Sequence, residues 1–91
     1  MFYLLQPTQL AARHGLSRIV ALLLRHGAST SSNSFGGLTP LMRAASNGHA
    51  AAVRTLLAAG ADKNDRNQFG ETPMSMAKAA GFAEVVKLLQ P

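Results

Sequence analysis

The chain has 91 residues, a net charge of +5 and no cysteine, and its apolar side chains are mostly those of alanine and leucine. This length allows one small domain, and the lack of cysteine excludes a disulfide framework and thiolate chemistry. The basic residues occur singly along the chain, which argues against an interface for nucleic acid.

The chain begins with a short apolar segment, Met1–Leu5. It is too short for a signal peptide and lacks basic residues at its start. No apolar run approaches the roughly 20 residues that a membrane-spanning helix needs. We therefore expect an intracellular protein, cytoplasmic or nuclear, with no membrane partner.

Residues 6–38 predict a pair of helices and a loop. Pro7 suits the first turn of a helix, but Gln6 before it is a weak N-cap, so this helix should fray at its start. The loop that follows the second helix is a serine-rich run, Ser29–Ser34, with little to order it.

Residues 39–71 predict the best-defined pair of helices. Thr39 is a good N-cap, and Pro40 suits the first helical position. The first helix places an apolar stripe of small residues toward a neighbour, and the second points its branched side chains inward. The inward residues are Leu41, Ala44, Ala45, Val53, Leu56 and Leu57.

Glycines end both helices of this unit, at Gly48 and Gly60. We expect Gly60 to adopt the left-handed conformation that glycine provides after a helix. The segment Ala61–Gly70 is too polar for a core strand and reads as an extended, hairpin-like loop.

Residues 72–91 repeat the start of this pattern with Thr72 and Pro73 and stop about one turn before the second helix should end. We expect Met74 in the core, and Met42 and Met76 at the edge of the stack. Neither end of the chain looks like a polar cap, so we expect a fragment, a truncated isoform or an array that depends on another segment.

The three segments match one another at a spacing of 33 residues. The matching positions include the turn and core residues, such as Pro7, Pro40 and Pro73 or Val20, Val53 and Val86. Each unit is a helix, a tight turn, a second helix and a long loop, and none can bury its apolar face alone. The fold class is therefore an all-α repeat solenoid of stacked helix-turn-helix units, in a single domain over residues 1–91.

The combined motif resembles the ankyrin repeat family. It consists of Thr-Pro-Leu at 39–41, Ala-Ala at 44–45, Gly-His at 48–49, Leu-Leu at 56–57 and Gly-Ala-Asp-x-Asn at 60–64. The resemblance extends over about residues 6–91, with units at 6–38, 39–71 and a truncated 72–91. The histidine that usually follows Thr-Pro-Leu is replaced by Met42 and Ser75, so the loops should be less well braced.

No catalytic or metal-binding pattern emerges. The three histidines, His14, His26 and His49, occupy three different positions of the repeat, so stacking does not gather them. The oxygen-rich loop at 62–65 lacks the spacing and the closing glutamate of a calcium loop. We expect no enzyme activity, no metal and no cofactor.

The resemblance implies a binding surface for another protein on the concave face, built from first helices and hairpin tips. Helical geometry selects the stripe opposite the buried one, and loop position selects the tips. The expected contact residues are Arg13 and His14 in unit one, Arg43, Ser46 and Asn47 in unit two, and Phe35, Leu38, Arg66, Gln68, Phe69 and Glu71 on the loops. Of these, Phe35 and Phe69 are the expected anchors, because aromatic side chains at loop tips are typical of interfaces.

The resemblance also implies a modification site. Leu56, Asp62 and Asn64 have the spacing of ankyrin repeats that an asparaginyl hydroxylase modifies, although Lys63 replaces the usual apolar residue. The alternative is an Asn64 that stabilises the hairpin.

Two further functions stay open. The chain could be a structural segment of a longer array with no partner of its own. It could also bind acidic partners through charge alone, and such binding would weaken steeply with salt. The sequence does not identify a partner or an oligomeric state, although a monomer or a part of a longer array is expected.

Overall fold

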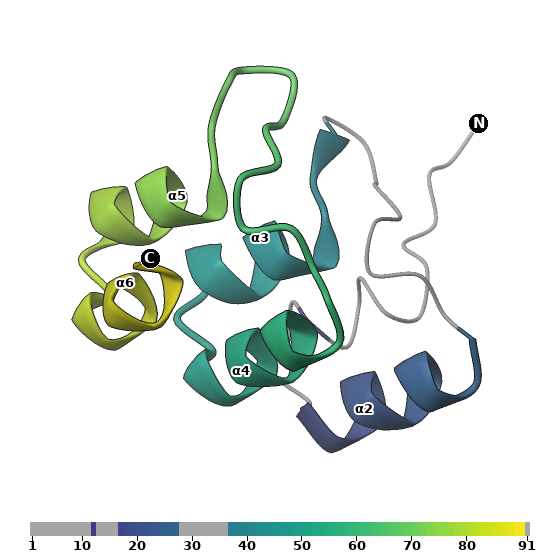
Figure 1. The fold of residues 1–91 in the computed structure, drawn as a ribbon. Coiled ribbons are helices and arrows are strands. Elements are labelled where there is room, and N and C mark those ends of the chain that lie inside the picture. The colour runs from purple at the N-terminus through teal and green to yellow at the C-terminus, as the bar shows by residue number, and fades with distance from the viewer. Residues whose placement is uncertain (1–11, 13–16, 28–36, 91) are drawn as a thin grey trace.

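The computed structural model describes residues 12, 17–27 and 37–90, and this part of the chain is helical with loops and no strand (Figure 1). The helices are α2 (Ser17–Arg25), α3 (Pro40–Ser46), α4 (Ala50–Ala58), α5 (Pro73–Ala80) and α6 (Ala83–Leu89). The expected all-α stack of helical units is confirmed.

The helices begin and end where local chemistry predicts. The hydroxyl oxygen of Thr39 accepts a hydrogen bond from the backbone N–H of Met42 (3.2 Å), with Pro40 in the first turn. Thr72 does the same for Ser75 (3.1 Å), and the Ser75 hydroxyl accepts in return from the Thr72 N–H (2.9 Å). Ser75 therefore forms a capping box, which the sequence reading did not anticipate. The left-handed conformation predicted for Gly60 is confirmed, with φ at 95°.

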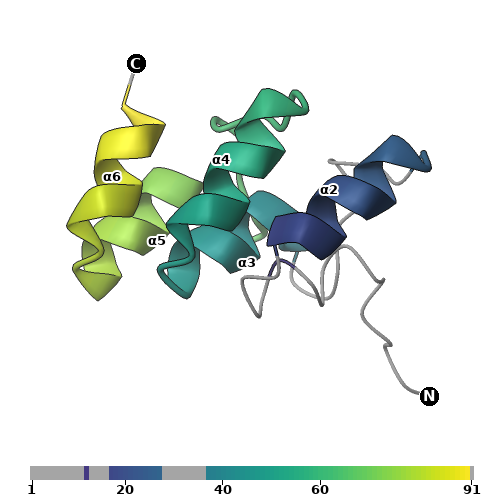
Figure 2. The ribbon, with the colours of Figure 1, turned by 90° about the horizontal axis from the view of Figure 1, so that it is seen from below.

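The helices form two layers. The first helices α3 and α5 lie side by side, and the second helices form a row in the order α2, α4, α6 (Figures 1 and 2). Each first helix also contacts the second helix of its own unit. The loop between α4 and α5 rises beside the first helices, on the side away from the row (Figure 1). This arrangement leaves one surface bounded by first helices and loop.

The core consists of small and branched side chains between these layers. Leu41, Ala44, Ala45, Val53 and Leu56 are all fully or almost fully buried, as predicted. Alanine permits the backbones to approach closely, so a thin stack can still exclude water.

The predicted position of Met42 was wrong. Its side chain is fully buried, whereas we expected it at the edge of the stack. The repeat explains the error, because the equivalent residue of the last unit, Ser75, is exposed. Burial at this position therefore depends on a following unit, which α3 has in α5. Met74 and Met76 are both half-buried.

The last unit exposes polar side chains at three positions that are apolar in the middle unit. Ser75, Lys78 and Gln90 are exposed and occupy the positions of Met42, Ala45 and Leu57 in the middle unit. The outer face of α5 and α6 is therefore hydrophilic at positions where the middle unit is apolar.

Within the described residues, no helix has the length and apolar character needed to cross a bilayer.

Candidate functional site

The loop between α4 and α5 closes in a tight turn that one side chain holds together. Asn67 is nearly buried, and its Oδ1 accepts hydrogen bonds from the N–H groups of Phe69 and Glu71, both at 2.9 Å. Its Nδ2 donates to the Glu71 carboxylate at 2.8 Å. The backbone adds Gly70 N–H to Asn67 C=O (3.1 Å) and Asn67 N–H to Glu71 C=O (3.0 Å). The turn is thus held by hydrogen bonds within residues 67–71, which together we call its brace.

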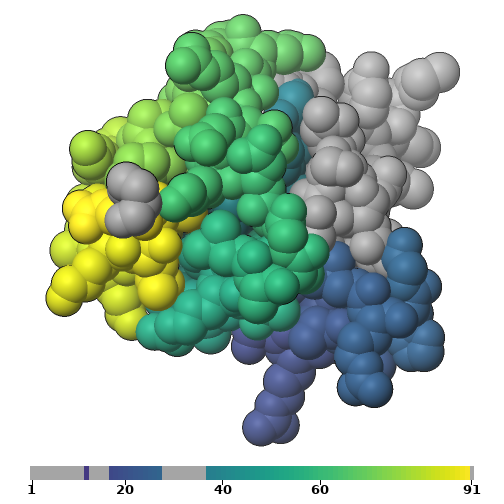
Figure 3. All heavy atoms as spheres, viewed as in Figure 1, coloured from purple at the N-terminus to yellow at the C-terminus, as the bar shows by residue number. Residues whose placement is uncertain are grey.

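This brace presents Phe69 to solvent. The Phe69 side chain is 79% exposed, by far the most exposed large apolar group among the described residues. Gln68 beside it and Arg66 before it are also exposed. In Figure 3 the loop stands at the upper rim of the molecule, in green. An apolar ring held in water by a hydrogen-bonded turn is available for contact without rearrangement.

A close backbone approach supports the turn from the side of α3. A methyl group placed on Gly37 would lie 3.3 Å from the backbone nitrogen of Gln68. The segment before α3 and the turn therefore pack backbone against backbone, which glycine allows because it has no Cβ. This contact restrains the turn relative to α3.

The exposed side of α3 carries the other predicted polar contact residues. Asn47 is exposed, while Arg43 and Ser46 are half-buried. The Asn47 Nδ2 donates to the Arg43 carbonyl (2.7 Å), and the Ser46 hydroxyl donates to the same carbonyl (3.2 Å). Both side chains thus satisfy a carbonyl in the last turn of α3, where intrahelical donors run out.

The other predicted contact residues lie near the base of the loops or outside the described part. Leu38 is half-buried directly before the N-cap of α3, and Glu71 directly precedes that of α5. Arg13, His14 and Phe35 lie outside the described residues. Among the described residues, the turn packs against Gly37 before α3, while Arg43 and Ser46 lie along α3 and Asn47 directly follows it.

Asn64 lies at the start of the same loop. Its side chain is exposed, and its backbone N–H donates to Asp62 Oδ1 at 2.8 Å. Desolvation of the Asp65 carboxyl, together with the charge of Asp62 and a hydrogen bond to it, raises the pKa of Asp65. Across the described residues, no three His, Asp or Glu side chains gather as metal ligands would.

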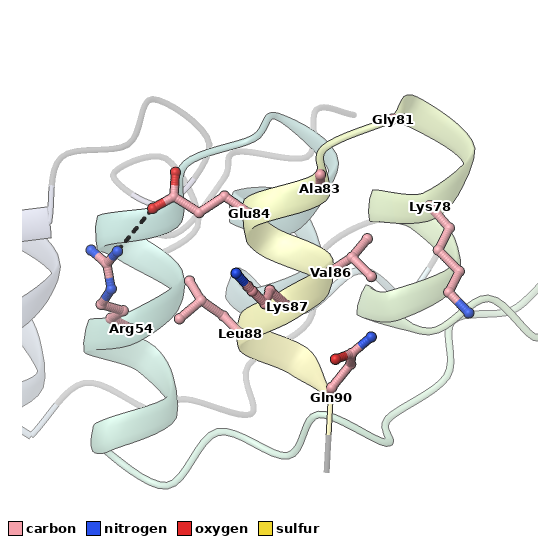
Figure 4. Close-up of a pocket in the computed structure, with 9 residues that line it drawn as sticks. All are labelled: Arg54, Lys78, Gly81, Ala83, Glu84, Val86, Lys87, Leu88 and Gln90. Atoms are coloured by element: carbon pink, nitrogen blue, oxygen red, sulfur yellow. Dashed lines mark hydrogen bonds and ion pairs between the residues drawn. The ribbon is translucent and has the colours of Figure 1, made fainter.

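A hollow also lies around α6 (Figure 4). It opens widely to solvent. Its lining includes the ion pair of Arg54 with Glu84 (3.0 Å) and the side chains of Lys78 and Lys87. Small-molecule sites are usually enclosed and largely apolar. This hollow is open rather than enclosed, so it lacks the shape of such a site, and it spans α6 and the neighbouring Arg54 of α4.

Sequence reasoning missed three features of the surface. Asn67 was overlooked because a polar loop residue carries no sign that it will be buried. Phe82 packs against Gly48, where a methyl group would lie 2.9 Å from its ring carbons. Ile19 and Leu22 on α2 are 49% and 53% exposed. Their signal was available, because the positions equivalent to Ile19 are apolar in every unit.

Comparison with known proteins gives one family. A family model described as ankyrin repeats, in three copies, matches residues 5–67. A search of curated proteins found no significant match.

Proposed function

The chain belongs to the ankyrin repeat family, whose repeats are in general protein-interaction modules, and we propose that it binds another protein through the turn at Phe69 and the adjoining side of α3. The observation that carries this proposal is the 79% exposure of Phe69 on a turn that Asn67 holds rigid. We propose no catalysis of its own and an intracellular location, as is usual for the family.

Phe69 is suited to be the anchor. A phenylalanine ring buries much apolar area while few torsions become fixed, and aromatic residues dominate the energetics of many interfaces. Its turn is fixed before binding by hydrogen bonds within residues 67–71. Little conformational entropy is then lost when a partner covers the ring.

The net positive charge of the chain favours an acidic partner. Arg66 precedes the turn, and Arg43 lies on the adjoining helix. The whole chain carries a net charge of +5. Such a field accelerates association with acidic proteins and contributes less to the final affinity.

Affinity capture from cell extract with wild type, Phe69→Ala and Lys87→Ala tests the proposal. Lys87 is an exposed control on α6, away from the turn. We expect Phe69→Ala to lose a partner that wild type and Lys87→Ala both retain, with unchanged melting temperature. Recovery of the same proteins in the same amounts by all three would instead favour a purely structural segment.

Salt dependence separates this proposal from binding by charge alone. A partner anchored by Phe69 should remain bound as salt rises, because apolar contact is not screened. Binding that disappears at high salt and is unaffected by Phe69→Ala would favour the purely electrostatic function.

Asn64 is a proposed site of hydroxylation. Its exposed side chain is accessible to an enzyme, and it follows Asp62 at the spacing given above. Mass spectrometry of the protein purified from cells should find a gain of one oxygen atom on Asn64. The unmodified residue in every peptide, from cells that modify other ankyrin proteins, would end the idea.

A further inference from the structure

Two large apolar side chains are exposed side by side on α2. Ile19 is 49% exposed and Leu22 is 53% exposed, and they lie one helical turn apart, on the same face of the helix. Opposite them, Val20 is fully buried in the core. The helix therefore has an apolar face toward the core and a second, smaller apolar patch toward solvent.

The repeat shows what normally covers this position. Ala52 on α4 and Val85 on α6 are equivalent to Ile19, and they are 0% and 1% exposed. Helix α4 packs against α2, and α6 packs against α4. Helix α2 ends the described row, with α4 on one side and no described helix on the other (Figure 2). The exposed patch thus continues an interface that the molecule already uses twice.

Charged residues on the second helices indicate which charge a helix docked on α2 should carry. Arg54 on α4 contacts Glu84 on α6 at 3.0 Å, so an ion pair joins these neighbouring second helices (Figure 4). Arg18 occupies on α2 the position that Glu84 occupies on α6. A helix packed before α2 in the same register would therefore meet a cation where α4 meets an anion. An acidic residue at the place of Arg54 would complete the pair.

A second copy of the chain does not meet this requirement. Its second helices carry Ala21, Arg54 and Lys87 at the position in question, and none is acidic. Pairing of α2 with α2 would also bring Arg18 and Arg25 of both copies together, and like charges disfavour such contacts.

We infer that the outer face of α2 docks an amphipathic helix of another protein, with small apolar residues toward Ile19 and Leu22 and an acidic residue toward Arg18. The mode is helix against helix, with apolar anchors at one-turn spacing. This surface is separate from the turn at Phe69, which lies on the other side of the layers (Figure 1). The two sites can therefore be tested independently.

The probe is a fluorescent peptide with the sequence of residues 50–58 and the substitution Arg54→Glu. A side-chain bridge on its outer face holds it helical, because a helix this short is marginal alone. The matched control peptide keeps arginine. Fluorescence anisotropy with the full chain should show binding of the glutamate peptide and about fivefold weaker binding of the control, the most that an exposed ion pair usually provides.

Variants of the full chain then test whether the peptide binds at the outer face of α2. The double variant Ile19→Ser/Leu22→Ser should reduce affinity for the glutamate peptide at least tenfold, while Phe69→Ala should leave it unchanged. Arg18→Glu, at an exposed position, should reverse the order of the two peptides, and this readout does not depend on the double variant folding. Absence of binding, equal affinity for both peptides, or an order that Arg18→Glu leaves in place would overturn the inference. So would a wild-type dimer that the double variant converts to monomer, since a second copy would then cover the face.

Discussion

The middle unit, α3 with α4, and the last unit, α5 with α6, share a period and much of their sequence, yet they bury different positions. Ala45 is fully buried, and its equivalent Lys78 is exposed. Gly48 lies under the ring of Phe82, while Gly81 has no atom within 4 Å of the place of a Cβ. The middle unit has a neighbour on either side among the described helices, and the last unit has one before it. The comparison teaches that the core of this molecule lies between units as much as within them.

The largest effect on stability is expected at the repeat position that Ala45 occupies in the middle unit and Lys78 in the last unit. Ala45→Lys puts an ammonium group between α3 and its neighbours, and it should lower the free energy of unfolding by about 3–5 kcal/mol. Lys78→Ala makes the converse change in the last unit and should alter it by less than about 0.5 kcal/mol. Denaturant unfolding measures both. Similar losses in the two variants would show that the units are equivalent.

The next largest loss of stability is expected at a pair of equivalent leucines. Leu56 is fully buried in the middle unit, and Leu89 is its equivalent at 3% exposure. Leu56→Ala should cost about 2–5 kcal/mol, which would unfold most of so small a stack, and Leu89→Ala should fall at the low end of that range. Thermal melting followed by circular dichroism compares them. An unchanged melt for Leu56→Ala would contradict its inward position.

A glycine pair separates backbone strain from packing. Gly48 and Gly81 have nearly the same positive φ, 75° and 79°, so alanine should cost about 1 kcal/mol of strain at either position. Only at Gly48 does the new methyl meet the Phe82 ring, at 2.9 Å, which should add about 1–3 kcal/mol. Chemical denaturation of the two variants should therefore differ by that amount. Combining Gly48→Ala with Phe82→Leu should remove most of the difference.

The smallest effect is expected for the ion pair between the units. Arg54 and Glu84 meet at 3.0 Å, but their side chains are 56% and 69% exposed. A double-mutant cycle with Arg54→Ala and Glu84→Ala should give a coupling below about 1 kcal/mol that decreases with added salt. A large coupling insensitive to salt would mean that the pair determines how α4 meets α6.

The sequence predicted what depends on local chemistry. Thr39 and Pro40 marked the start of α3 and Gly60 the end of α4, because capping and backbone preference act over a few residues. The period of 33 then predicted the stack and the inward position of Leu56. These parts of the fold need no knowledge of neighbours.

Features that depend on contacts between units, or between parts of a folded loop, could not be predicted from local sequence. Met42 and Ser75 hold one position of the repeat, and a following unit decides which is buried. Asn67 braces the turn through groups that meet only after the loop folds. The exposed Phe69 was expected from its place on the loop, and its side chain is exposed, whereas the exposure of Ile19 was not foreseen.

The most direct test of the proposed binding surface is the affinity of the captured partner for Phe69→Ala relative to wild type, both shown to be equally folded. Loss of an aromatic anchor at the centre of an interface usually costs about 2 kcal/mol or more, so the dissociation constant should rise roughly thirtyfold. A constant within about twofold of the wild-type value would contradict the assignment, because it would place the contact away from the turn.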